Sequence, residues 1–243
     1  MVTRDRPALL ADALASVAAQ TVPPLEVCLG DDAAEPMVQV PRAGAVPVRV
    51  VRCGAGHVAR ARNRTARAAR GEWLALLDDD DRWTPAHLAG LAEALASDAA
   101  LLYRDTAVVR ERIAEDGTRI ETARRVIARE WDPALMRTDD FIAPSATVLR
   151  RSLFERLGGF DEDMRYSEDW DLLLRAARVS TPRRVSGVTV EVRMRDHGHL
   201  SGDTGAERRA CLDSLSARHG LPPLEIRTFW EVAAIAAAAD GPS

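Results

Sequence analysis

The sequence has few cysteines, no dense run of positive charge and no apolar stretch long enough to cross a bilayer. Its three cysteines, Cys28, Cys53 and Cys211, are widely spaced. Without a CxxC or Cys/His pattern, they argue against a disulfide framework and a zinc site. A reducing compartment is the default for such a chain. Because no signal peptide with an apolar core is present, we expect a cytoplasmic protein.

Two further absences narrow the class of protein. Acids and bases are well mixed, the formal net charge is −4, and no basic stripe predicts a nucleic-acid partner. The most apolar late stretch, residues 229–240, is far shorter than the roughly 20 residues of a transmembrane segment. It is more typical of a helix packed in the core or at an interface, which leaves a homodimer and peripheral attachment to a membrane open.

The N-terminal part of the sequence alternates between helical and extended patterns. Helices are predicted at residues 7–20, 58–70 and 85–97, and strands at residues 25–30, 46–52, 72–77 and 100–103. This alternation with short connections is typical of α/β proteins with a Rossmann-like, mostly parallel sheet and helices on both faces. In such sheets ligands bind beyond the carboxyl ends of the strands.

The later part of the sequence continues without a linker. Its expected elements are a hairpin at 106–127 turning at Asp116 and Gly117, a strand and short helix ended by Gly158 and Gly159, a helix with Ser167 as N-cap, a long strand or strand pair at 183–195, and a helical tail from Ala206. These boundaries follow from turn and cap residues. Since there are no internal repeats, we expect one continuous domain.

Acidic side chains follow two of the expected strands. Asp31 and Asp32 end one strand, and residues 78–81 form an unbroken run of aspartates after another. Mg²⁺ binds one or two carboxylates together with substrate phosphates, so an Asp-x-Asp pair at a strand end suits a nucleoside-diphosphate site. Taken alone, the run fits an acidic turn that caps a helix at Pro85 equally well.

Three arginines in the segment ARARNR, Arg60, Arg62 and Arg64, precede the strand that leads to the aspartates. Guanidinium groups and a cation together suit a diphosphate. Arg60 and Arg64, each taken separately, are more typical of a solvated helix face.

Five segments in a fixed order resemble the large inverting family-2 glycosyltransferases with the GT-A fold. They are TRDRP, QTVPPLEVCLGDDAAE, ARARNR, GEWLALLDDDDRWTP and RRSLFERLGGFDEDMRYSEDW. Each segment is unspecific, whereas the five in the family's order are specific. The resemblance implies transfer of a sugar, with inversion, from a UDP, GDP or dTDP sugar to an unidentified acceptor hydroxyl, with Mn²⁺ or Mg²⁺ as cofactor.

The resemblance also divides the expected domain. Residues 1–103 would form the nucleotide-sugar-binding half, residues 104–205 the half with the acceptor site and the catalytic base, and residues 206–243 a C-terminal helical tail. Family members usually have several more apolar residues before the threonine of the first segment. Only Met1 and Val2 stand there, so we expect either a misassigned start or a shortened first strand.

The positions that the resemblance implies for the nucleotide sugar are Thr3, Arg4, Asp32, Arg62, Asp78 and Asp79. Thr3 and Asp32 are expected at the nucleobase, and Arg62 near the nucleotide or its phosphates. Asp79 is expected near the ribose or the sugar. Because Arg4 and the segment DDAAE depart from the family's pattern, the donor base stays open.

The resemblance further implies a metal site. Asp80 is the expected ligand, and Asp78 is either a second ligand or a contact to ribose or a metal-bound water. Asp81 is expected to cap the following helix. In the segment RMRDHGHLSGD, His197 would complete the metal site, with His199 as the alternative, although a loop histidine is more often merely exposed.

Two carboxylates and a tryptophan begin one predicted helix, in the segment SEDWD. Glu168 and Asp169 suit a first helical turn, where the helix dipole stabilises them by about 0.3–1 kcal/mol. The resemblance instead implies that Asp169 is the general base and Glu168 its neighbour. We expect the helix end to lower the pKa of Asp169. Trp170 would floor the acceptor pocket or pack in the core.

Two other classes of protein stay open. Nucleotidyltransferases that form sugar nucleotides also join an α/β sheet to an acidic metal site. They usually carry a glycine-rich loop after the first strand, and TRDRPAL has no glycine. A non-catalytic relative would bind a nucleotide sugar without turnover, which the retention of Asp78, Asp80 and Asp169 argues against.

Overall fold

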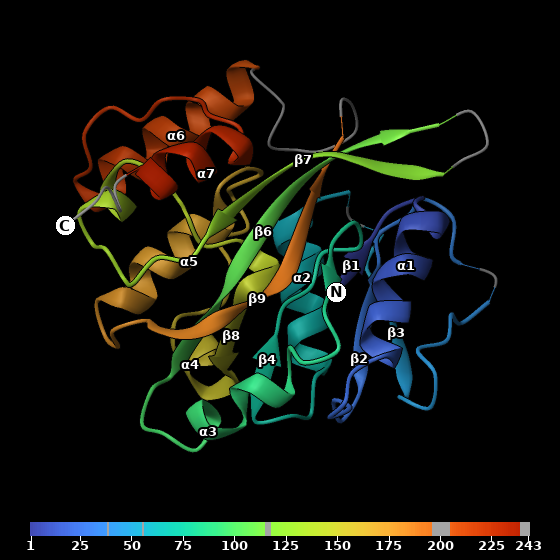
Figure 1. Cartoon of the computed structure of the whole chain (residues 1–243). Coiled ribbons are helices and arrows are strands. Elements are labelled where there is room, and N and C mark those ends of the chain that lie inside the picture. Colours follow the sequence, from blue (N-terminus) through green and yellow to red (C-terminus); the bar gives the residue numbers. More distant parts are fainter. Residues whose placement is uncertain (38, 55, 115–117, 196–204, 239–243) are drawn as a thin grey trace.

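The structure is a computed structural model that describes residues 1–37, 39–54, 56–114, 118–195 and 205–238. It contains two neighbouring sheets with helices around them (Figure 1). The first sheet consists of β1 (Val2–Thr3), β2 (Val27–Asp31) and β3 (Val48–Arg52). Its order is β1-β2-β3 and both pairings are parallel.

Helices cover both faces of the first sheet. On one face, Leu10 and Leu14 of α1 (Pro7–Ala18) share a core cluster with Leu29 of β2. On the other face lies α2 (Val58–Ala68), so close that a Cβ added at Gly30 would stand 2.2 Å from Thr65 Oγ1. Alternate residues of a strand point to opposite faces, so this short apolar strand is buried on both sides, as predicted.

The second sheet is mixed. It consists of β4 (Trp73–Ala75), β8 (Thr147–Arg150), β6 (Leu101–Ile113), β9 (Arg183–Met194) and β5 (Arg82–Trp83), in this spatial order, with β7 (Arg119–Ile127) paired to β6. Only β6 and β9 pair in parallel here. The predicted α/β class is confirmed, whereas the mostly parallel arrangement is limited to the first sheet and this pair. A short connection such as that between β6 and β7 permits only antiparallel pairing.

The predicted helix at 85–97 is reduced to the 3₁₀ turn Ala89–Leu91 and the short α3 (Ala92–Leu95). Gly90, a poor helix former, stands in this 3₁₀ turn, and a Cβ there would lie 2.8 Å from a guanidinium nitrogen of the buried Arg104. The pattern of leucines reflects burial rather than a continuous helix, and Leu91 is fully buried.

The C-terminal part adds four helices to the described residues. They are α4 (Arg151–Arg156), α5 (Glu168–Ala177), α6 (Ala206–His219) and α7 (Phe229–Ala238), with 3₁₀ turns at Leu135–Arg137 and Pro144–Ala146. Gly158 and Gly159 follow α4 with φ of 80° and 81°, as the turn prediction requires. β9 is one long strand rather than a pair. The predicted turn at Asp116 and Gly117 lies outside the described residues.

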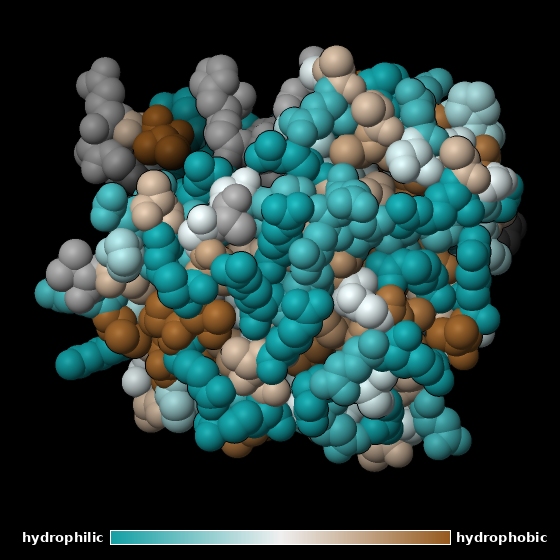
Figure 2. Space-filling model, turned by 180° about the vertical axis from the view of Figure 1, so that it is seen from behind, coloured by the Kyte–Doolittle hydropathy of each residue, from teal (hydrophilic) through white to brown (hydrophobic). Residues whose placement is uncertain are grey.

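Two further expectations concern single elements. Ser167 occupies the N-cap position of α5, as predicted, but its φ is 61° and its hydroxyl makes no capping hydrogen bond. Trp230 and Ala233 of α7 are buried in the main core, which agrees with a packed helix. Among the described residues, no helix combines the length and apolarity needed to cross a membrane. From behind, hydrophilic side chains cover most of the surface (Figure 2).

Candidate active site

A cleft of about 520 Å³ brings together segments that lie far apart in the sequence. Its walls come from the start of the chain, the loop after β4, the beginning of α5, the end of β9 and the C-terminal helices. The predicted site residues that line it are Thr3, Arg4, Asp32, Arg62, Asp78, Asp79, Asp80, Glu168, Asp169 and Trp170. His197 and its alternative His199 lie outside the described residues.

The first strand and the end of β2 fix one wall of the cleft. The Thr3 hydroxyl donates a hydrogen bond of 2.6 Å to Asp79. Burial raises the pKa of Asp79 to about 6, although the bond from Thr3 lowers it. Asp32 accepts hydrogen bonds of 3.1 Å from the backbone N–H groups of Gly56 and His57, which joins β2 to the start of α2.

Arg62 links the aspartate run to α5. Its guanidinium lies 2.5 Å from an Asp78 oxygen and also donates to Glu168, while its side chain is only 13% exposed. Burial alone would lower the pKa of Arg62, but Asp78 and Glu168 raise it above its ordinary value. The guanidinium therefore stays charged and neutralises two carboxylates from separate segments.

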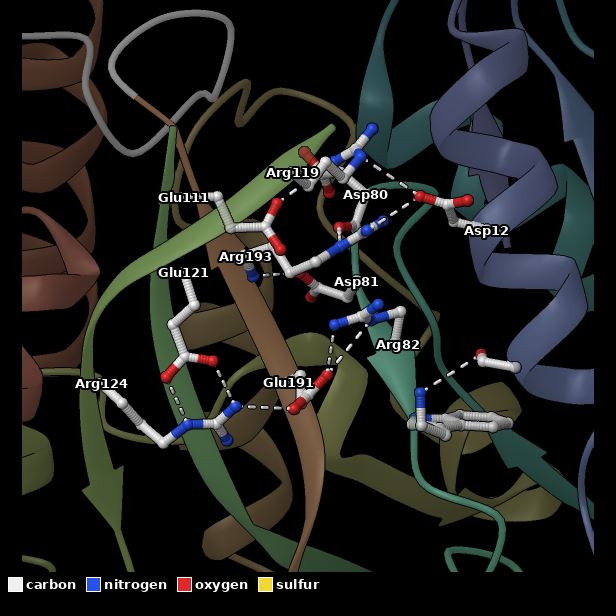
Figure 3. Close-up of polar contacts among 12 residues, drawn as sticks. Asp12, Asp80, Asp81, Arg82, Glu111, Arg119, Glu121, Arg124, Glu191 and Arg193 are labelled. Carbon is white, nitrogen blue, oxygen red and sulfur yellow. Dashed lines mark hydrogen bonds and ion pairs between the residues drawn. The ribbon is translucent and has the colours of Figure 1, made fainter. Parts of the chain in front are cut away.

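Asp80 is surrounded by arginines, one of which, Arg193, is drawn beside it in Figure 3. Arg6 and Arg195 donate to the same carboxylate oxygen at 3.1 and 2.8 Å. The Arg193 Nε donates to the backbone carbonyl of Asp80 at 2.6 Å. Burial and the neighbouring Asp78 raise the pKa of Asp80, which the arginines oppose.

Asp81 has a structural position different from the predicted one. It accepts hydrogen bonds from the Ser145 hydroxyl at 2.5 Å and from the Arg193 backbone N–H at 3.1 Å. The prediction that Asp81 caps the following helix is therefore wrong. Its carboxylate instead fastens β9 and the turn at Pro144–Ala146 to the end of the aspartate run.

Asp169 lines the cleft at the start of α5, where its carboxylate accepts a 2.9 Å hydrogen bond from the Trp170 N–H. Burial raises the pKa of Asp169, so the predicted lowering by the helix end is wrong: loss of hydration outweighs the dipole. Trp170 is 6% exposed and its indole donates to the Met136 carbonyl at 3.0 Å. It is thus a core residue with one edge on the cleft.

The described residues contain no group of three or more His, Cys, Asp and Glu side chains placed to hold a metal. A hard cation that arrives with a diphosphate needs only one or two protein carboxylates. Asp80 would suit this role, because carboxylate oxygens are its preferred ligands and Asp80 lines the cleft. Asp78 is held by Arg62. The donor set therefore fits a cation bound jointly with substrate phosphates.

Sequence reasoning missed several charged residues of the site. Arg193 is in β9 and Arg195 follows the last residue of that strand, and both contact Asp80. Their spacing of two residues, which places side chains on one face of an extended chain, was the available signal. Arg6 belongs to the first segment, TRDRP, and lines the cleft. Asp140 also lines it, and burial and Asp169 raise its pKa well above the ordinary value. No local motif marks this aspartate.

Comparison with solved structures defines the class of fold. Residues 1–349 of TarS from S. aureus, in complex with UDP-GlcNAc, align with a TM-score of 0.63 and 17% identity over 95% of this chain and 68% of that chain. The mannosyltransferase PcManGT from Pyrobaculum calidifontis, in complex with GDP-Man and Mn²⁺, aligns with a TM-score of 0.57 and 18% identity over 100% and 74%. The fold is that of the GT-A glycosyltransferases.

The sequence comparison then gives the family. A profile of Glycosyl transferase family 2 matches residues 1–158, and the chain belongs to this family. The uncharacterized glycosyltransferase YwdF of Bacillus subtilis (strain 168) is 35% identical over 233 residues, covering 94% of this chain and 86% of YwdF. The O-antigen biosynthesis protein RfbC of Myxococcus xanthus is 30% identical over 184 residues, only 14% of its length. The predicted family and enzyme class, a glycosyltransferase, are confirmed.

Proposed function

We propose that the protein transfers a sugar from a nucleoside-diphosphate sugar to an acceptor hydroxyl, with inversion at the anomeric carbon. One observation carries the proposal: Thr3, Arg62, the aspartate run at 78–81 and Asp169, from separate parts of the chain, line a single cleft. The complexes of TarS with UDP-GlcNAc and of PcManGT with GDP-Man and Mn²⁺ support a sugar-nucleotide donor.

The residues suggest how the reaction would proceed. Asp169 accepts the proton of the acceptor hydroxyl as its oxygen bonds to the anomeric carbon. The bond between that carbon and the diphosphate oxygen breaks, and the nucleoside diphosphate leaves. When bound, a divalent cation would neutralise the charge that develops on this leaving group. Asp80 would hold the cation, while Arg62 keeps Asp78 and Glu168 together in the same cleft.

Donor binding is expected to depend on a cation. In a thermal unfolding screen with UDP-, GDP- and dTDP-sugars, one of these donors should raise the unfolding temperature in the presence of Mn²⁺. Saturation at about 100 times Kd corresponds to about 2.7 kcal/mol of added stability. Asp80→Ala should lose the cation-dependent part, whereas Asp213→Ala, at an exposed ion pair with Arg209, should keep it.

The products of turnover separate the remaining classes. A transferase releases nucleoside diphosphate from the donor that the screen identifies. Release of pyrophosphate from a nucleoside triphosphate would instead indicate a nucleotidyltransferase. If no sugar nucleotide stabilises the protein with or without Mn²⁺, the proposed function is wrong.

The pH dependence of transfer should reflect the buried base. Asp169 works only when deprotonated, and burial raises its pKa. The acid limb of kcat/KM is therefore expected above the ordinary aspartate value of about 3.9, with activity falling as the pH decreases. Asp78→Asn should move this limb to lower pH, because the carboxylate of Asp78 is one of the groups that raise the pKa of Asp169. A limb at the ordinary value, unmoved by this substitution, would contradict Asp169 as the base.

A further inference from the structure

The side chain of Asp80 meets two positive charges where a cation would bind. Arg6 reaches it from the loop before α1, and Arg195 from the end of β9. The Arg6 side chain is 34% exposed and lines the cleft, while that of Arg195 is 11% exposed. The same Asp80 oxygen accepts both bonds, so a dication at this oxygen would have to displace guanidinium groups.

The arginines here have unused hydrogen-bonding capacity. Arg193 is 2% exposed, lines the cleft and donates through Nε and Nη1, yet among the described residues its buried Nη2 has no partner. The buried Nε of Arg195 has none either within the same ranges. Buried donors without partners are costly. An anion with several oxygens beside Asp80 would satisfy them, and phosphate oxygens match the guanidinium geometry.

We propose that Arg6 and Arg195 bind the donor diphosphate, and that they neutralise Asp80 only until a dication and the donor enter together. This rests on the proposed function and assigns the phosphate-binding residues within it. Arg193 acts as a positioning residue, because it holds the backbone of Asp80 and the side chain of Asp12 in α1 (Figure 3).

The formal charges explain why the two ligands would enter as a pair. A divalent cation and the dianionic diphosphate of the donor carry equal and opposite charge, so their joint entry leaves the net charge around Asp80 unchanged. The cation alone would face two displaced guanidinium groups, and the donor alone would face Asp80 beside Asp78. Each ligand should therefore strengthen the binding of the other, and such coupling is reciprocal.

Two binding measurements on the full chain test whether a dication replaces Arg6 and Arg195 at Asp80, which we call the exchange. Neither measurement needs the donor base or the acceptor to be known. In the first, Mn²⁺ alone is titrated and the free ion is followed by electron paramagnetic resonance. Arg195→Gln and Arg6→Gln should each tighten Mn²⁺ binding about tenfold, because a competing positive charge is removed. In the second, inorganic pyrophosphate alone is titrated by calorimetry, and both variants should bind it about tenfold more weakly.

Arg124→Gln is the matched control, since Arg124 also makes two ion pairs, but with Glu121 and Glu191, neither of which lines the cleft as Asp80 does. It should change neither affinity. Arg6 is partly exposed, so its variant remains informative if Arg195→Gln unfolds at lower temperature. Unchanged or weaker Mn²⁺ binding in the variants would overturn the exchange, and unchanged pyrophosphate binding would overturn the phosphate role. Either result can occur while a sugar nucleotide still binds, so it leaves the proposed function standing.

Discussion

Asp169→Asn should lower the rate of sugar transfer by about 10²–10⁴-fold and leave the affinity for the donor unchanged. The reason is that an amide of the same shape cannot take the proton of the acceptor hydroxyl, which is the contribution expected of a general base. The carboxylate also accepts a hydrogen bond from the Trp170 N–H, which an amide oxygen can still accept. The measurement is turnover at saturating donor, paired with donor-dependent thermal stabilisation of the same variant.

Two companion variants make this result specific. Asp213→Asn changes an exposed aspartate of α6 and should transfer sugar at the normal rate. Asp140→Asn removes another acidic side chain of the cleft, one whose pKa Asp169 raises, and tests the rival assignment. Should Asp140→Asn lose transfer while Asp169→Asn retains it, the base is Asp140 and the proposed mechanism has to be rewritten.

Arg62→Met should reduce the free energy of unfolding by about 3–5 kcal/mol, the cost of removing one partner of a buried ion pair. The substitution leaves Asp78 and Glu168 in the cleft without their shared positive charge, and Glu168 is only 4% exposed. Denaturant unfolding monitored by circular dichroism measures the change. Arg124→Met, at a half-exposed ion pair, should cost no more than about 1 kcal/mol.

The loss of unfolding free energy in Arg62→Met should depend on pH in a definite direction. Burial already raises the pKa of Glu168, and the positive charge of Arg62 is the largest influence that lowers it. Without Arg62, the folded state holds the Glu168 proton to higher pH than the unfolded state does, so lowering the pH stabilises the variant relative to the wild type. Because the pKa of Glu168 is about 8 with Arg62 present and higher without it, the difference between the two proteins should shrink as the pH falls through the alkaline range toward 8. A difference that grows on acidification would show that Arg62 acts through packing alone.

The elements that the sequence predicts well are those whose local pattern and tertiary position agree. The strand that becomes β2 is apolar, and Asp31, Asp32 and turn residues stand at its end. The local pattern therefore predicts both a buried strand and the place where it ends. Gly158 and Gly159 indicate the end of α4, because the chain there adopts positive φ values, which glycine tolerates better than other residues. The site residues that the resemblance implies, where the structure describes them, line one cleft.

The features that the sequence does not predict depend on partners far away along the chain. The carbonyl of Gly90 accepts a hydrogen bond from the guanidinium of Arg104, a contact that the helical pattern around Gly90 does not indicate. Asp81 turns toward Ser145 and Arg193, more than 60 residues away. The pKa of Asp169 is governed by burial, which no local spacing reports. The arginines around Asp80 do not form a sequence motif either, because their role depends on the carboxylate that they contact in the folded protein.

The long pairing between β6 and β9 has a consequence for how the protein is made. Leu102 pairs with Arg183 and Arg110 with Met194, so contacts beside the aspartate run join points some 80 residues apart. High contact order slows folding, and a nascent chain on the ribosome holds β6 long before β9 emerges. The donor site can therefore form only after most of the polypeptide has been synthesised, and until then the edge of β6 needs shielding from aggregation.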